Sequence, residues 1–426
     1  MIQEIQREPG FAVMSFGLTD RQRELRSKSR HIGEDVLRQV GVMAERLPSP
    51  QERFAATRPA YERLIADGFL RACIPQSAGG DNQSLIDTAI VVEELYCGNP
   101  SIALTLVGTV LGLQPILVGG SEEQKERLLA PFLADTGAPL AGFCSSEPGG
   151  SANAASPPPG DGVRTSARRD GDHWVINGRK KWVSSATGWD GMGAEVLCVV
   201  CRTDREAPPE RAVSIIVAEK PAEHLVLDRV IDSPGYRAHL LPEFSLRDVT
   251  ASIENLIGEQ GAGLRLSGES FVSAAALVGI FGVALMRSAL DHVLRFARSE
   301  RRGGVVPIVE HQAVGYALAD AKVSIEAARA LSWRACRAVD VGHPARQELA
   351  NHAKIFGSET AVRVITDLMQ VVGVDSYDDT DPLNGLLQDA LALPVFGGGN
   401  MGVRRRALHA LMKSPDYDPL TAADAI

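Results

Sequence analysis

The chain has few cysteines and no framework of paired ones. Its six cysteines are scattered through 426 residues with no secretory leader ahead of them, so we expect no disulfide bonds and a cytoplasmic location. Cys198 and Cys201 have the Cys-x-x-Cys spacing of metal and redox sites, but no second pair accompanies them. Because the pair lies in an apolar run, a buried strand from Val196 to Cys201 is expected, and no metal site.

Positive charge is also in short supply. The formal net charge of −9 argues against a general nucleic-acid binder, which must neutralise phosphates. Charge is absent altogether from Leu95 to Ser121, yet this run contains two prolines, an asparagine and a glutamine. A second apolar run, Ser273 to Met286, is too short to span a bilayer. We expect buried helices here, in a globular protein of two to three domains, and no membrane segment.

Helix signals dominate both ends of the chain. Capping-box patterns predict helix starts after Thr19, Ser49 and Ser121. Beyond Gly263, long apolar-periodic segments rich in alanine and glycine predict a closely packed bundle. The first 15 residues have no strong pattern and are expected to form a loosely held arm.

Between these ends, Gly and Pro punctuate short strand-like segments. Asp170-Gly171 and Asn177-Gly178 predict two hairpin turns and so a three-strand meander, with Trp174 and Trp182 on neighbouring strands. A polar, glycine-rich loop precedes the meander and offers hydroxyls and close backbone N–H groups to a ligand. Loop and sheet together could form a wall for a flat heteroaromatic molecule. Further strands are expected at 196–201, 213–218 and 244–249.

Two segments carry a family resemblance. EPGGS at 147–151 and NGRKKWVSS at 177–185 resemble the acyl-CoA dehydrogenase superfamily, whose usual forms are close to TEPxAGSD and NGxKxWITN. Weaker matches, such as EEL at 93–95 and MQVVG at 369–373, extend the resemblance over nearly the whole chain. It implies an α+β fold in three parts. These are an N-terminal helical domain (1–138), a central small β-barrel (139–258) and a C-terminal four-helix bundle (259–426).

The resemblance also implies FAD and assigns residues to it. Phe143, Ser145 and Ser146 would line the flavin, Trp182 would pack on it, and Ser184 would lie near its N5 atom; the bland alternative is a set of ordinary hairpin residues. Four bundle residues are also assigned to FAD: Arg301, Gln312, Gln370 and Gly373. The segment that holds Arg301 and Gln312 resembles one that reaches the FAD of a neighbouring subunit, in a homotetramer or homodimer. Arg301 could instead be a solvated surface residue, since Arg302 adjoins it. Ser151 and Ser273 are assigned to the substrate.

The carboxylate base of the family is missing. An ungapped alignment places the family's YEGT on residues 396–399, so Gly397 stands where the catalytic glutamate is expected. The alternative position, on a bundle helix, is Val272. Glu269 lies one helical turn before Val272 and is our predicted substitute. A glutamate at a helix start is, however, more often a cap or a surface residue.

The tail contains a literal G-x-G-x-x-G, from Gly397 to Gly402, followed by Arg404 to Arg406. A dinucleotide-binding turn would need a further strand and an acidic residue about 20 positions on, and the chain nearly ends here. Glycines at a helix start with added positive charge do favour an anion, such as a phosphate of FAD or of pantetheine. The alternative is a solvated basic helix end.

Three functions follow. The first is an FAD-dependent oxidoreductase that dehydrogenates an acyl thioester, carried on CoA or an acyl-carrier protein, with electron-transfer flavoprotein or O2 as acceptor. The tail resembles divergent relatives in secondary metabolism, which fits this first function. The second is a flavin-dependent monooxygenase or oxidase on the same fold, which needs no carboxylate at position 397. The third is a catalytically silent flavoprotein or an assembly subunit.

Overall fold

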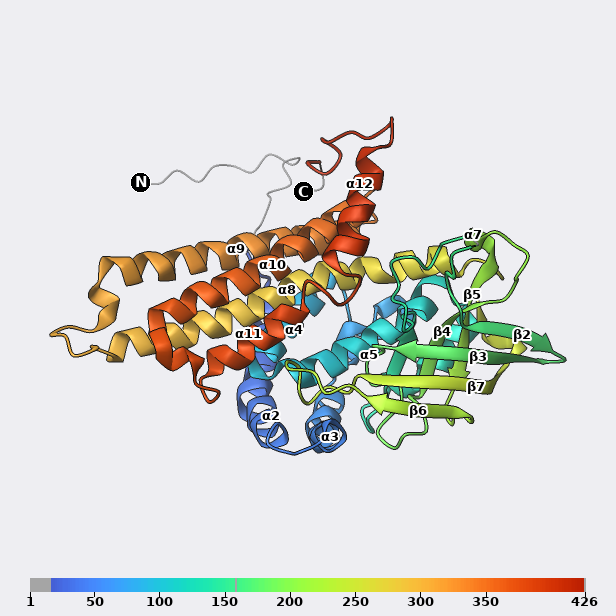
Figure 1. Cartoon of the computed structure of the whole chain (residues 1–426), viewed down its shortest axis with the longest axis horizontal. Coiled ribbons are helices and arrows are strands. Elements are labelled where there is room, and N and C mark those ends of the chain that lie inside the picture. The colour runs from blue at the N-terminus through green and yellow to red at the C-terminus, as the bar shows by residue number, and fades with distance from the viewer. Residues whose placement is uncertain (1–16, 158, 425–426) are drawn as a thin grey trace.

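The computed structural model describes residues 17–157 and 159–424, so the predicted N-terminal arm lies outside the described residues. Figure 1 shows a helical bundle on the left, a sheet on the right, and the N-terminal helices below and between them. This is the predicted α+β architecture. The N-terminal helices are α1 (Asp20–Ile32), the π-helical η1 (Gly33–Leu37), α2 (Arg38–Ala44), α3 (Pro50–Ala66), α4 (Leu85–Gly98), α5 (Pro100–Gly119) and α6 (Glu122–Leu133).

The three predicted helix starts are confirmed. The side chains of Thr19, Ser49 and Ser121 each accept a hydrogen bond from the backbone N–H three residues on. The side-chain oxygen of the Gln or Glu at that third position accepts a hydrogen bond from the backbone N–H of the cap residue, which completes the capping box. These short-range contacts need only neighbours in sequence, which is why they could be predicted.

Two groups of strands form the sheet. Its strands are β1 (Ala141–Cys144), β2 (Ser166–Asp170), β3 (His173–Lys181), β4 (Val196–Arg202), β5 (Val213–Glu219), β6 (Leu225–Val230), β7 (Pro242–Ser252) and β8 (Leu256–Ile257). They follow the order β6-β7-β3-β2-β4-β5-β8, and β1 pairs with β4. A single parallel contact, Ser166 with Arg202, joins the two groups. The short helix α7 (Pro209–Ala212) leads into β5.

One predicted turn is wrong. β3 runs unbroken through Asn177 and Gly178, and a β-bulge shifts its register with β7 at this point. The hairpin forms only at Asp170-Gly171, where Asp170 pairs with His173. Gly178 serves a different purpose, because a Cβ here would stand 2.4 Å from Oγ1 of Thr165. Trp174 therefore lies within β3 and Trp182 directly after it, and not on neighbouring strands.

The C-terminal bundle is built on one long helix. Its elements are α8 (Gly263–Ser299), α9 (Gln312–Asp340), α10 (Arg346–Val372), α11 (Pro382–Ala392), the π-helical η7 (Asn400–Arg405) and α12 (Arg406–Met412). The predicted close packing through glycine is confirmed on α8. A Cβ on Gly279 would stand 2.2 Å from Oγ of Ser332 on α9, and one on Gly282 would stand 2.4 Å from the carbonyl of Gly357 on α10. Helices α5 and α8 are long and apolar enough to cross a membrane, but 67% and 78% of their most apolar windows are buried in the protein, as in core helices.

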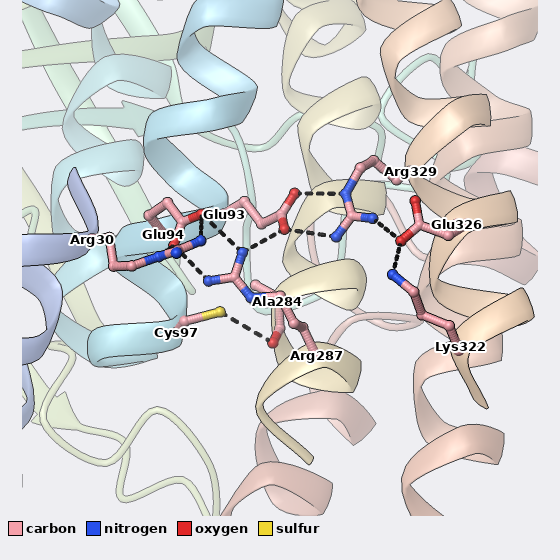
Figure 2. A network of polar contacts seen from close by, with 9 residues as sticks. All are labelled: Arg30, Glu93, Glu94, Cys97, Ala284, Arg287, Lys322, Glu326 and Arg329. Atoms are coloured by element: carbon pink, nitrogen blue, oxygen red, sulfur yellow. Dashed lines mark hydrogen bonds and ion pairs between the residues drawn. The ribbon is translucent and has the colours of Figure 1, made fainter. Parts of the chain in front are cut away.

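A buried ionic network fastens the N-terminal helices to the bundle (Figure 2). Glu94 on α4 accepts bonds from Arg30 on α1 and Arg287 on α8. Glu93 beside it accepts from Arg287 and from Arg329 on α9. Both carboxylates are buried, so each needs these partners. The network fixes α4 against three helices from two domains.

Candidate functional site

The residues predicted to line the flavin, here called the flavin wall, include Phe143 on β1 and Trp182 after β3, and they lie beside α8. Lys181 N donates to the carbonyl of Ser146 at 3.1 Å. This bond places Trp182 beside the loop that carries Ser145, Ser146 and Ser151, here called the serine loop. The Trp182 side chain is 52% exposed and its φ is 63°, so a large aromatic ring stands open at the end of a strand. Phe143 packs on Phe271 of α8 with ring centroids 5.0 Å apart. An exposed indole beside serine hydroxyls fits the flat ring of a flavin.

A buried ion pair holds the serine loop in place. Glu147 lies 2.9 Å from Nζ of Lys180, and it also accepts the backbone N–H groups of Arg164 and Thr165. Burial raises the pKa of Glu147, but Lys180 and these donors outweigh it, so the pKa lies below its ordinary value. Lys180 is wholly buried and also donates to the carbonyl of Val200. The glutamate of the EPGGS motif is therefore a structural anchor.

Ser184 takes part in a hydrogen-bonded chain that sequence analysis missed. Its Oγ lies 3.1 Å from Nε2 of His239, and Nδ1 of His239 lies 2.9 Å from Oγ1 of Thr105 on α5. Thr105 already donates to the carbonyl of Ser101. It must therefore accept from Nδ1–H, which leaves Nε2 bare to accept the Ser184 hydroxyl. Burial lowers the pKa of His239 to about 3, so the imidazole is neutral.

The bundle residues assigned to FAD lie toward the left of Figure 1, in the loop after α8, at the start of α9 and at the end of α10, on the side of the bundle away from the sheet. Arg301 is in the loop after α8 and donates to the carbonyl of Val305. Gln312 begins α9, and Gln370 lines a cavity of about 370 Å³ between α9 and α10. Gly373 ends α10 with φ 78°. Within one chain the structure does not bring this group to the flavin wall.

The residues assigned to the substrate lie near the flavin wall. Ser273 Oγ donates to Gln114 on α5 at 3.3 Å, two residues beyond the flavin-wall contact of Phe271. Ser151 is half-buried in the serine loop. Glu269, our predicted base, is half-exposed and pairs with Arg265 one turn earlier at 3.1 Å. That is the setting of a surface ion pair, so its role as a base stays a prediction.

The turn at Gly397 is the second part of the site. Gly397 and Gly398 have φ values of 59° and 78°, in the left-handed region that favours glycine. Arg404 donates to the carbonyls of both residues and to Asn351. It is buried, and no carboxylate pairs with it in the described part of the chain. Burial lowers the pKa of Arg404 to about 10, which still leaves it charged.

A second buried cation lies beside the same turn. Lys354 on α10 is wholly buried, and its Nζ donates to the carbonyl of Leu393 at 3.2 Å and to Oδ1 of Asn400 at 2.8 Å. Its Cε lies 3.9 Å from the position that a Cβ on Gly397 would occupy. Burial, and then the charge of Arg404, lowers the pKa of Lys354 to about 7.

The two parts of the site share α8. Phe271 contacts the flavin wall, and Val278, seven residues on, lies 3.9 Å from the position of a Cβ on Gly397. Residues seven apart lie on one face of a helix, about 10 Å apart along its axis. The apolar floor beneath the turn is aromatic, since Phe396 packs on Phe281 and Tyr236.

The other two tail arginines are engaged locally. Arg405 pairs with Glu359 at 2.6 Å, and Arg406 donates to the carbonyl of Ala152 and to Asn153 in the serine loop. Arg405 and Arg406 therefore do not form the open cluster of arginines that was expected to bind an anion. The tail instead closes over the loop that carries Ser151.

The cysteine pair lies where a buried strand was expected. Cys198 and Cys201 are both buried in β4, and burial raises the pKa of each thiol. All six cysteines are free, and residues 17–157 and 159–424 contain no group of His, Cys, Asp and Glu suited to hold a metal ion. The cytoplasmic location stays a prediction.

Three models of one family match the chain in order. They are the N-terminal, middle and C-terminal domains of acyl-CoA dehydrogenase, over residues 19–136, 142–249 and 261–412. The chain is 41% identical to the nitroalkane oxidase of Podospora anserina, over 87% of this chain and 89% of that protein.

Solved structures of nitroalkane oxidase superpose closely. One, with a TM-score of 0.93 and 32% identity, covers 97% of this chain and 100% of its own; it is an active-site mutant with an aspartate replaced by asparagine, crystallised with 1-nitrooctane. Another, with a TM-score of 0.92, 32% identity and the same coverage, addresses the roles of that aspartate and of an arginine seven positions later in the reaction of this flavoprotein. The chain thus belongs to the acyl-CoA dehydrogenase superfamily, and it is a flavoprotein oxidoreductase with FAD as its cofactor.

Proposed function

We propose that this protein is an FAD-dependent oxidase whose substrate is a nitroalkane. The observation that carries the proposal is similarity to nitroalkane oxidases along nearly the whole chain, at 41% and 32% identity. This favours the oxidase alternative over dehydrogenation of an acyl thioester. The acyl-CoA dehydrogenases among the relatives are less similar, at 29% and 27% identity.

The tail supports the same reaction with one change. Arg404 follows Gly397 by seven positions, the spacing of the arginine and the active-site aspartate in the nitroalkane oxidase. The ungapped alignment to the wider family reaches the same position. The spacing and the ungapped alignment both support Gly397 as the position of the reactive carboxylate in relatives, and the arginine is present.

A nitro group suits a site with a weakened base. When a C–H bond beside a nitro group loses its proton, the negative charge is shared by the two nitro oxygens. The demand on the base is therefore smaller than for a thioester. Buried Arg404 would stabilise this charge, because positive charge fixed in a site of low dielectric acts strongly on a developing anion. Ser184, Trp182 and Phe143 would position the cofactor, and FAD, when bound, would accept two electrons and pass them to O2.

A homo-oligomer completes the proposal. Phe271 contacts Phe143 near the start of α8, and about 40 Å of helix separates it from the end of α8, where Arg301 follows. Gln312, Gln370 and Gly373 belong to the same end of the bundle, so all four would serve the FAD of a neighbouring subunit. A dimer is the smallest assembly that meets this need.

The experiment is anaerobic titration of the purified flavoprotein with 1-nitropropane, 1-nitrohexane and a panel of acyl-CoA thioesters. We expect nitroalkanes to bleach the oxidised flavin band and, in air, to drive oxygen uptake. Bleaching by a thioester but by no nitroalkane would favour dehydrogenation of an acyl thioester instead. A flavin that no compound bleaches would favour a catalytically silent flavoprotein.

A further inference from the structure

The geometry points to Lys354 as the general base that takes the place of the missing carboxylate, with Arg404 stabilising the anion it produces. The inference rests on the proposed function, since it names the proton acceptor for that reaction. Lys354 comes from α10, whereas the carboxylate of relatives belongs to the tail turn. The reactive group would thus have moved to another element that faces the same point.

Position 397 lies within contact distance of Lys354. A Cβ built there meets only Cε of Lys354 and Cγ2 of Val278 within 4 Å, both at 3.9 Å. A side chain at 397 would therefore begin between Lys354 and α8, the helix that also carries Phe271. Nζ of Lys354 is bonded to this Cε, so the amine lies close to the position that the side chain of an aspartate at 397 would occupy.

The hydrogen bonds of Lys354 suit a neutral amine. A neutral amine has two N–H groups and one lone pair, whereas an ammonium has three N–H groups and no acceptor. The carbonyl of Leu393 and Oδ1 of Asn400 accept two bonds, and no third acceptor is present among the described residues. Both donors of the neutral form are therefore satisfied and its lone pair is unused. An ammonium would leave one buried N–H without a partner.

The surrounding charges favour the same state. Arg404 from η7 faces Lys354 and opposes a second positive charge, while Glu359, five residues further along α10, favours it. Glu359 is already paired with Arg405 and accepts from Asn400, so its charge is largely compensated. Burial adds to the effect of Arg404, and the pKa of Lys354 falls to about 7.

The step is a simple proton transfer. The C–H bond beside the nitro group breaks, the proton forms a third N–H bond on Nζ of Lys354, and the electron pair stays on the substrate as the nitronate. Arg404 then faces an anion, and the ammonium and the nitronate attract each other. Later loss of the proton to water restores the amine.

The test compares two substrates in one variant. A neutral nitroalkane needs the base, whereas its nitronate, prepared beforehand in alkali, does not. Lys354→Met in the FAD-loaded protein should reduce the rate of anaerobic flavin reduction by the neutral compound by about 10²–10⁴-fold, the usual contribution of a general base. The rate with the nitronate should be nearly unchanged. In the unmodified protein the rate with the neutral compound should rise with pH through about 7, as Lys354 loses its proton.

A rescue separates chemistry from anchoring. Gly397→Asp in the Lys354→Met background restores a carboxylate at the position seen in relatives, and aspartate is among the residues that tolerate φ near 59°. It should recover neutral-substrate oxidation, whereas Gly397→Asn, of the same size but without a base, should not. Exchange of the α-proton in D2O, followed by NMR with the dithionite-reduced protein, gives a readout that needs no turnover.

The outcomes are distinct. Lys354→Met could still oxidise the neutral nitroalkane and exchange its α-proton, or it could lose oxidation of the neutral compound and of the nitronate to the same extent. Either result would show that Lys354 only anchors the tail turn, and the inference would be wrong. If the unmodified protein oxidises the nitronate but not the neutral compound, the inference fails and the substrate of the proposed function is corrected from a nitroalkane to its nitronate. If neither compound bleaches the flavin, the proposed function fails, and the Lys354 assignment goes with it.

Discussion

Ser184 Oγ donates its proton to Nε2 of His239, across 3.1 Å, and the direction of that bond is set by Thr105 on the far side of the ring. The serine expected near N5 of the flavin therefore has its hydrogen committed within the protein. Toward a ligand, its oxygen can only accept. The chain links α5, the end of β3 and the segment before β7, so it fixes the serine from two sides.

We expect His239→Leu to lower the free energy of unfolding by about 1–3 kcal/mol, because it leaves the half-buried hydroxyl of Ser184 and the buried hydroxyl of Thr105 each short of a partner. The flavin absorption band should shift as Ser184 turns. Thr105→Val is the matched control, since it removes only the distal contact. Denaturant titration and the visible spectrum provide the measurements, and an unchanged spectrum in His239→Leu would separate Ser184 from the flavin.

Breaking the Glu147–Lys180 pair should loosen the serine loop. Lys180→Met leaves Glu147 buried with only backbone donors, and removing one member of such a pair costs about 3–5 kcal/mol. The double change Lys180→Met with Glu147→Gln removes the uncompensated charge and should be more stable than the single one. Thermal unfolding and retention of flavin on gel filtration would show this, and a double variant weaker than the single one would contradict it.

The ionic network at α4 should resist salt and fail in acid. Glu94→Gln leaves Arg287 without a full partner and is expected to cost about 3–5 kcal/mol. Glu326→Gln, in a more exposed pair on α9, should cost less than about 1 kcal/mol. Although burial raises the pKa of Glu94, its arginine partners lower it below 4.5 overall. Its contribution is therefore present above the unfolded value and is lost as pH falls through the folded one, which urea titrations at several pH values can follow.

Asp389 should respond to pH in the opposite direction. Burial raises its pKa to about 7, and its Oδ1 accepts from Tyr236 N at 2.6 Å. A carboxyl whose pKa is raised on folding stabilises the protein in acid, and that contribution declines as pH rises from about 4 to about 7. Asp389→Asn keeps the acceptor and should flatten this decline, whereas the exposed Asp379→Asn should leave it in place. A slope that survives in Asp389→Asn would assign it to another group.

Local signals predicted the framework of the molecule, and long-range contacts decided the site. The capping boxes at Thr19 and Ser121 depend on residues three positions apart and could be predicted from sequence. Asn177-Gly178 has the same local signature as a turn, but pairing with β7, some 70 residues away, keeps β3 straight. The roles of Lys354 and His239 depend on partners that are remote in sequence, Asn400 and Thr105. No spacing in the sequence marks them, although the missing carboxylate at Gly397 did indicate where to search.

The way Arg404 holds the tail has a consequence for evolution. Its guanidinium grips main-chain oxygens of residues 397 and 398, which every amino acid possesses. The turn therefore keeps its shape whichever side chain position 397 carries, provided that residue accepts a left-handed backbone. The backbone of the turn therefore does not depend on the side chain at position 397. In evolution the reactive group at this position could be lost, regained or exchanged while the fold stays the same.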